Sequence, residues 1–185
     1  MKKIISVLCS LCLCMAVSAQ QHMKFMGIPL DGTIDNFALK LKAKGVTYDA
    51  AESKAAEAGT RIFYGKFMGE KARFIVFYNY KSKIVFSAAV ELNYPTVESA
   101  HTPFVNLSDQ LQQKYPYATC KAYKGPDGDV DGMAMDIFDE TGDNKIGFIL
   151  QTLNASSSGY GISIYLTYAD SDNLAKSDKI LNEDL

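Results

Sequence analysis

The sequence predicts an α+β fold in which two tandem helix-plus-antiparallel-sheet units pack into one compact domain. Three observations predict it. Apolar residues recur with helical spacing in two segments, 33–44 and 102–115. Each segment is followed by short runs in which apolar and polar residues alternate, and polar turns join these runs. The 185-residue chain is 48% apolar and 22% charged, which is the composition of a globular protein.

The first 19 residues have the features of a bacterial secretory signal peptide. Lys2-Lys3 precedes an uncharged, mostly apolar run, residues 4–17, which is too short to span a membrane as a helix. Val17 and Ala19 occupy the −3 and −1 positions of a cleavage site. We therefore expect cleavage after Ala19 and secretion to the periplasm or the exterior of a bacterial cell. Loss of the two lysines changes the formal net charge from −2 to −4.

The first unit is expected in residues 20–94. Its helix, 33–44, carries one apolar stripe and ends before Gly45, a residue type favoured just after a helix. The stripe consists of Ile34, Phe37, Ala38 and Leu41. Residues 49–58 are compatible with a loop or with a short helix. Strands are expected at 61–67, 72–80 and 84–92, and their short connecting turns predict antiparallel neighbours.

The second unit is expected in residues 95–170. Thr102 is a good helix N-cap and Pro103 suits the first helical position, so the helix is expected to begin there. It is expected to end at Tyr115-Pro116, because the residue before a proline disfavours helix. Strands follow at 118–124, 133–139, 146–153 and 160–168. Residues 171–185 are expected to form a C-terminal helix or tail.

The two units are expected to share one plan. Ile34 corresponds to Phe104 at an offset of 70 residues, and the last strands, 84–92 and 160–168, are offset by 76. These offsets suggest an old tandem repeat. We expect the apolar stripes of both helices to pack against the even-numbered residues of those two strands, because side chains alternate between the faces of a sheet.

Three segments resemble parts of uncharacterised secreted bacterial proteins: 27–32 (GIPLDG), 65–69 (GKFMG) and 168–173 (YADSDN). The order of helices and strands also resembles the architecture of β-lactamase-inhibitor proteins. That resemblance implies a concave sheet surface that grips a partner protein, and hence an inhibitor-like function. A shared fold does not by itself specify a shared function.

Composition and motifs argue against several classes of function. A negative net charge without a basic stripe argues against a nucleic-acid partner. No segment after residue 19 is apolar enough to predict a membrane span. The sequence has no phosphate-binding glycine loop, zinc-ligand motif or nucleophile elbow. We therefore expect a non-enzymatic binding protein without a resident cofactor, whose partner is a protein or a glycan.

Tyrosines on the expected strands are the candidate binding surface. Tyrosine is enriched at interfaces, so a solvent-exposed sheet face that carries several of them is suited to binding a partner. The alternative is that the rings cover the core and only their hydroxyl groups reach water, because aromatic residues favour strands regardless of function. The candidate residues are Tyr64, Tyr78, Tyr80, Tyr123 and Tyr165.

An acidic segment is the candidate metal site. Asp127, Asp129 and Asp131 alternate before Gly132, as in the first half of a calcium-binding loop. Such a loop needs a carboxylate at its twelfth position, where this chain has Phe138. A calcium-stabilised structural module and a solvated acidic hairpin turn therefore both remain open.

An extracytoplasmic hydrolase that acts on glycan or peptide is the rival function. Cys120 is the only cysteine after residue 19, and a thiolate there could act as a nucleophile with His101 as its base. No cysteine-protease signature surrounds it. Cys120 alternates with Ala118 and Ala122, which favours an inert buried thiol. Paired carboxylates for glycoside cleavage depend on a spatial separation that a sequence does not contain.

Overall fold

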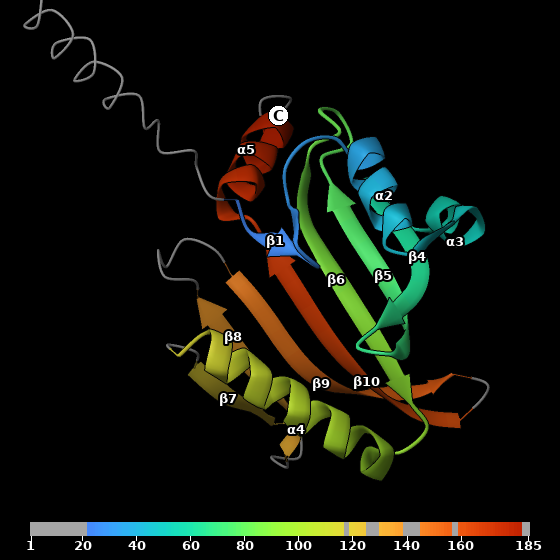
Figure 1. Ribbon diagram of the computed structural model, residues 1–185, viewed down its shortest axis with the longest axis vertical. Coiled ribbons are helices and arrows are strands. Elements are labelled where there is room, and N and C mark those ends of the chain that lie inside the picture. Colours follow the sequence, from blue (N-terminus) through green and yellow to red (C-terminus); the bar gives the residue numbers. More distant parts are fainter. Residues whose placement is uncertain (1–21, 117–118, 125–129, 139–144, 157–158, 183–185) are drawn as a thin grey trace, which may run out of the picture.

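The computed structural model describes residues 22–116, 119–124, 130–138, 145–156 and 159–182 (Figure 1). The predicted signal peptide, residues 1–19, lies outside the described residues. The α+β class is confirmed: antiparallel strands form one large sheet, and helices lie on both of its sides. Within the described residues, no helix has both the length and the apolar character needed to cross a membrane.

Each half of the chain contributes four neighbouring strands to a single eight-stranded sheet. The strand order is β3-β4-β5-β6-β10-β9-β8-β7. The strands are β3 (Thr47–Asp49), β4 (Thr60–Phe67), β5 (Glu70–Tyr78), β6 (Val85–Tyr94), β7 (Thr119–Lys124), β8 (Val130–Phe138), β9 (Lys145–Ser156) and β10 (Gly159–Ala169). The last strands of the two halves, β6 and β10, pair at the centre. The two units expected from the sequence therefore share one sheet.

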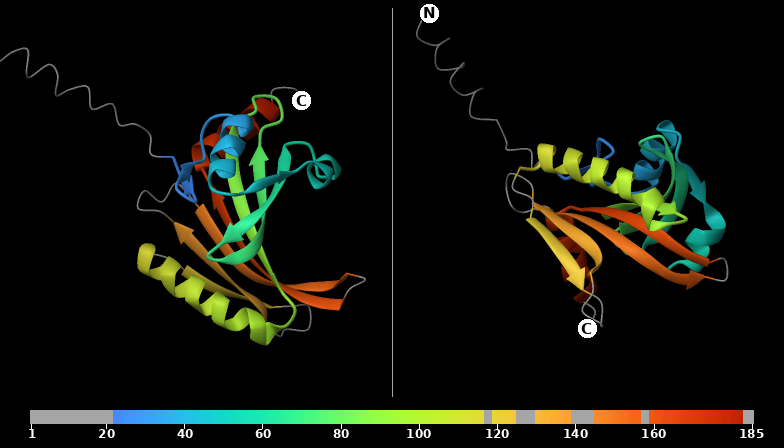
Figure 2. Two further views of the ribbon diagram at one scale, coloured as in Figure 1. Left: turned by 45° about the vertical axis from the view of Figure 1, so that its right-hand side comes forward. Right: turned by 90° about the horizontal axis from the view of Figure 1, so that it is seen from below.

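Helices cover the two faces of the sheet unequally. In the described part of the chain they are α2 (Ile34–Ala43), α3 (Ala50–Ala55), α4 (Val97–Lys114) and α5 (Ser171–Asn182). Figure 2 shows α2 and α4 on one side of the sheet and α5 on the other. Much of the second face is therefore not covered by the described helices.

The main core lies between the sheet and helices α2 and α4. The two predicted helix stripes are buried there through Ile34, Phe37, Leu41, Phe104, Leu107 and Leu111. The even-numbered residues of the two last strands join them, as predicted, through Ala88, Val90, Leu92, Ile164, Leu166 and Tyr168. Each fully buried large apolar side chain stabilises the fold by about 1.5–3 kcal/mol.

The alternation predicted for residues 84–92 is wrong at its beginning. The β5–β6 register shifts between Phe77 and Tyr78, and Val85 is fully buried in the main core. Ile84 and Phe86 are only half-buried and are outside that core. A β-bulge changes which residues face the core, because side chains alternate with a period of two.

The predicted start of the second helix at Thr102 is also wrong. Helix α4 begins at Val97, after the N-cap Thr96. The Thr96 hydroxyl accepts a hydrogen bond from the Ser99 amide, and the Ser99 hydroxyl accepts one from the Thr96 amide, both at 3.2 Å. This capping box satisfies amides at the helix start, so Pro103 lies inside the helix. The end of α4 just before Pro116 is as predicted.

The segment before α2 belongs to the core and is more than a turn. Strand β1, Lys24–Phe25, pairs with β2, Ile28–Pro29, around Met26-Gly27, where both residues have positive φ. The Phe25 ring is fully buried and packs edge-on against Phe74 and Tyr168. These contacts with β5 and β10 make the β1–β2 hairpin part of the packed domain.

Residues 49–58 contain the short helix α3, which is tied to the sheet. Asp49 caps it through a 2.8 Å hydrogen bond from the Glu52 amide to Oδ1. The Ser53 hydroxyl accepts a hydrogen bond from the Ile62 amide at 2.8 Å and donates one to the Ile62 carbonyl at 3.3 Å. Strand β3, which was not predicted, pairs with β4 immediately before α3. These contacts hold Glu52 beside the sheet.

Candidate binding surface

Four residues form a row across the face of the sheet that α2 and α4 leave uncovered. Tyr64 lies opposite Arg73, Arg73 opposite Glu91, and Glu91 opposite Tyr165. Directly opposite residues on neighbouring strands share a face. Phe74, the chain neighbour of Arg73, is buried in the main core, so Arg73 faces away from that core. We call these four residues the polar row.

The guanidinium group of Arg73 is held between two carboxylates. Its Nε donates to Glu52 Oε2 and its Nη1 donates to Glu91 Oε2, both at 2.9 Å. The Tyr64 hydroxyl also donates to Glu52, through the other carboxylate oxygen. Residues from α3, β4, β5 and β6 therefore fix one planar cation on the sheet face.

These contacts change the proton affinities of the row. The hydrogen bond from Tyr64, followed by that from Arg73, lowers the pKa of Glu52. The same bond to Glu52 raises the pKa of Tyr64. Burial acts to lower the pKa of Arg73, but hydrogen bonds to Glu91 and Glu52 outweigh it, and the pKa is raised. Charged Arg73 and Glu52 and neutral Tyr64 are therefore the favoured forms.

The polar network continues onto the central strand β10. The Ser163 hydroxyl is 2.6 Å from Asn93 Oδ1 and 3.2 Å from Glu91 Oε1. Ser163 is buried, whereas Asn93 is exposed. Tyr165 is half-buried, and its pKa is raised by burial and then by the nearby charge of Glu91. The network thus presents hydroxyl, amide, carboxylate and guanidinium groups on β5, β6 and β10.

Apolar side chains adjoin the row on the same face. Ile62, Ile75 and Ala89 form a second buried cluster, with Phe77 and Tyr165 packed against it. Ile62 precedes Tyr64 by two residues on β4, and Ile75 follows Arg73 by two residues on β5, so this pair lies farther from the hairpin turn than the row does. The face therefore changes from apolar to polar along the strands.

The structure divides the predicted tyrosine surface. Tyr64, which is 40% exposed, and Tyr165 belong to the polar row. Tyr78 packs against the main core instead, with the Arg61 guanidinium 5.7 Å from its ring centre. Tyr80 is 45% exposed beyond the end of β5. Tyr123 lies on β7, and its side chain is outside the described part of the structure.

Glu52, Arg73 and Glu91 were missed as site residues by the sequence reasoning. One signal was present: the two-residue turn Met68-Gly69, where both residues have positive φ, sets Tyr64 opposite Arg73. No local signal could have placed Glu52 there, because it reaches the row from α3.

The predicted calcium ligands are only partly within the described residues. Asp127 and Asp129 lie outside them, and Asp131 lies in β8. Among the residues that the structure describes, no three His, Cys, Asp or Glu side chains gather as a group that could hold a metal ion. The calcium site stays a prediction.

The rival catalytic residues lie on different elements. His101 is exposed on α4, and Cys120 lies on β7 with its side chain outside the described part. A separate hollow of about 310 Å³ lies between α5 and the β5–β6 connection. Asp31 is the one carboxylate among its lining residues, so a facing pair of acids is not assembled there.

No known protein family, curated protein or solved structure matches this chain. The resemblance to β-lactamase-inhibitor proteins stays a prediction.

Proposed function

We propose that this chain is a secreted, non-enzymatic binding protein, and that the polar row is its binding surface. The observation that carries the proposal is the fixed position of Arg73, between Glu52 and Glu91 and beside the exposed ring of Tyr64. A guanidinium that is already oriented loses little side-chain freedom when a ligand binds. Aromatic and arginine side chains are also the residue types enriched at binding surfaces.

The same geometry argues against the hydrolase alternative. A general acid at neutral pH needs a raised pKa, whereas the pKa of Glu52 is lowered. One oxygen of Glu52 and one of Glu91 accept hydrogen bonds from Arg73. Both carboxylates are therefore better suited to holding Arg73 than to exchanging protons with a substrate.

Two tyrosines on opposite faces provide a matched test. Tyr64 is 40% exposed in the polar row, and Tyr48 is 48% exposed on the α2 side, opposite Phe63. Wild type, Tyr64→Ala and Tyr48→Ala should be immobilised and exposed to proteins and polysaccharides from the periplasm and cell surface. We expect Tyr64→Ala to weaken retention of the ligand by about tenfold or more, and Tyr48→Ala to have little effect.

Circular dichroism should first show that both variants fold. Equal retention by Tyr64→Ala and wild type would remove the polar row as the binding surface. Turnover of a glycan or peptide library by the purified chain would replace the proposal with the hydrolase alternative.

A further inference from the structure

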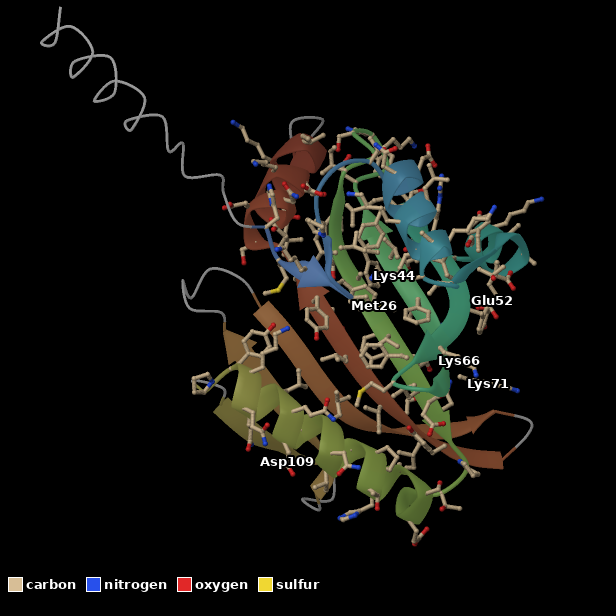
Figure 3. All side chains as sticks on the ribbon, viewed as in Figure 1. Met26, Lys44, Glu52, Lys66, Lys71 and Asp109 are labelled. Atoms are coloured by element: carbon tan, nitrogen blue, oxygen red, sulfur yellow. The ribbon has the colours of Figure 1, made fainter. Side chains whose placement is uncertain are left out.

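Two lysines of like charge face each other next to the polar row. Lys66 on β4 is directly opposite Lys71 on β5, and both are exposed. Figure 3 shows them together near the end of the β4–β5 hairpin. No salt bridge to an acidic residue is formed by either lysine within the described residues. Like charges directly opposite in a sheet are destabilising, so this pair costs stability without an anion between them.

The lysine pair shares the face of the polar row. Lys66 follows Tyr64 by two residues on β4, and Lys71 precedes Arg73 by two residues on β5. Alternation along each strand therefore points all four side chains to the same side of the sheet. An anion held by the lysines would lie next to the exposed Tyr64 ring and near the guanidinium of Arg73.

We propose that Lys66 and Lys71 bind the carboxylate of an acidic sugar, so that the ligand of the polar row is a glycan containing uronic acid. This inference depends on the proposed function of the row. Tyr64 offers an aromatic ring for an apolar sugar face. Arg73, Glu91 and Asn93 offer planar polar groups that hydrogen-bond hydroxyl groups.

The position of the site favours a glycan over an extended peptide. At Tyr64, Arg73 and Glu91, the strands β4, β5 and β6 are each paired on both sides. At the polar row a peptide therefore cannot join the sheet by backbone hydrogen bonds, which is how an extended segment binds a sheet edge. Recognition at this face must use side chains, and a glycan can be bound in that way.

The surrounding charges favour a sparsely charged ligand. Glu52 and Glu91 stand on either side of Arg73, which follows Lys71 by two residues on β5. These carboxylates would repel a densely sulfated chain, a nucleic acid or an anionic membrane. A chain that carries single carboxylates can place one between the lysines and turn its hydroxyl groups towards the row.

Calorimetric titration of the purified chain with short oligogalacturonates tests this inference. Lys66→Gln/Lys71→Gln removes the pair, and Lys40→Gln/Lys42→Gln is its control, because it removes the same charge from exposed positions on α2. We expect the first variant to weaken binding by about tenfold or more and the control to leave it unchanged. Methyl esterification of the probe should weaken binding to wild type in the same way. Lys66→Gln/Lys71→Gln should also unfold at a higher temperature than wild type, since a repulsive pair is lost.

The other outcomes separate this inference from the proposed function. If wild type binds a neutral glycan or a protein through Tyr64, and the lysine variant binds equally well, the acidic-sugar assignment is wrong and the binding surface stands. Tighter binding of heparin oligosaccharides than of oligogalacturonates, lost in the same variant, would overturn the sparse-charge assignment. If Tyr64→Ala retains every ligand of wild type, the proposed function itself fails.

Discussion

Val90 on β6 and Leu166 on β10 lie directly opposite each other in the middle of the eight-stranded sheet. Both side chains are buried in the main core. The 76-residue offset predicted between the last strands also takes Val90 to Leu166, so each residue pairs with its own counterpart in the other unit. The pair therefore lies where the two halves of the chain join.

Shortening this central side chain should destabilise the whole domain. We expect Leu166→Ala to lower the free energy of unfolding by about 2–5 kcal/mol, because it removes buried methyl groups and leaves a cavity. Urea denaturation followed by circular dichroism and by tyrosine fluorescence should give one shared transition. Leu174→Ala, at a position 38% exposed on α5, is the control and should cost little. Two separate transitions would show that the halves fold independently.

Asp170 should be a second sensitive position, because three groups converge on its buried carboxylate. Oδ2 accepts from the Met23 amide at 3.0 Å and lies 2.9 Å from His22 Nδ1, and Oδ1 accepts from the Asn173 amide at 3.0 Å. Asp170→Ala removes a helix cap and leaves a buried amide without a partner. We expect a loss of about 2–4 kcal/mol in urea denaturation.

Asp178→Ala is the control for this change, since Asp178 is exposed on the same helix. Its cost should stay below about 0.5 kcal/mol. If Asp170→Ala is no more destabilising than Asp178→Ala, Asp170 does not anchor the N-terminal segment.

The two possible starts of α4 predict different effects of one substitution. Inside a helix, proline removes a hydrogen bond and clashes with the preceding turn, so Pro103→Ala should raise the free energy of unfolding by about 1–3 kcal/mol. If the helix began at Thr102, Pro103 would occupy the first helical position and the change would bring no gain. Thermal unfolding distinguishes the two. Thr96→Ala should lower stability by about 1 kcal/mol, and Thr102→Ala should not.

Acid should lower the stability of the fold by protonating Glu52, whose carboxylate holds Arg73 in the polar row. Hydrogen bonds from Tyr64 and Arg73 lower the pKa of Glu52 in the folded state. A carboxyl group of this kind contributes stability above its unfolded pKa and loses it as the pH falls through the folded pKa. Between about pH 5 and pH 3, wild type should therefore lose more stability than Glu52→Gln, by less than about 1 kcal/mol because the site is solvent-exposed.

Denaturant titrations at several pH values measure this difference. Glu57→Gln is the matched control, because Glu57 is an exposed acid on the connection between α3 and β4. Its pH profile should follow that of wild type. A Glu52→Gln profile parallel to wild type would show that Glu52 carries no stabilising charge in the row.

Prediction from sequence succeeded where the signal was local. The stripe containing Phe37 and the alternation through Val90 each describe one element that presents an apolar face, and both faces are buried as predicted. It failed where a local preference had a competitor. Thr102-Pro103 has the features of a helix start, but the capping box at Thr96 places the N-cap six residues earlier.

The α+β class, most strands and the apolar faces follow from the sequence alone, because the periodicity of apolar residues is a property of consecutive positions. The pairing of β6 with β10 and the position of Arg73 between Glu52 and Glu91 are established only in the folded chain. Those contacts join residues such as Ser163 and Glu91, which are 72 positions apart. Periodicity states which face of a strand is apolar but not which strand becomes its neighbour, so the binding surface arises only when the chain has folded.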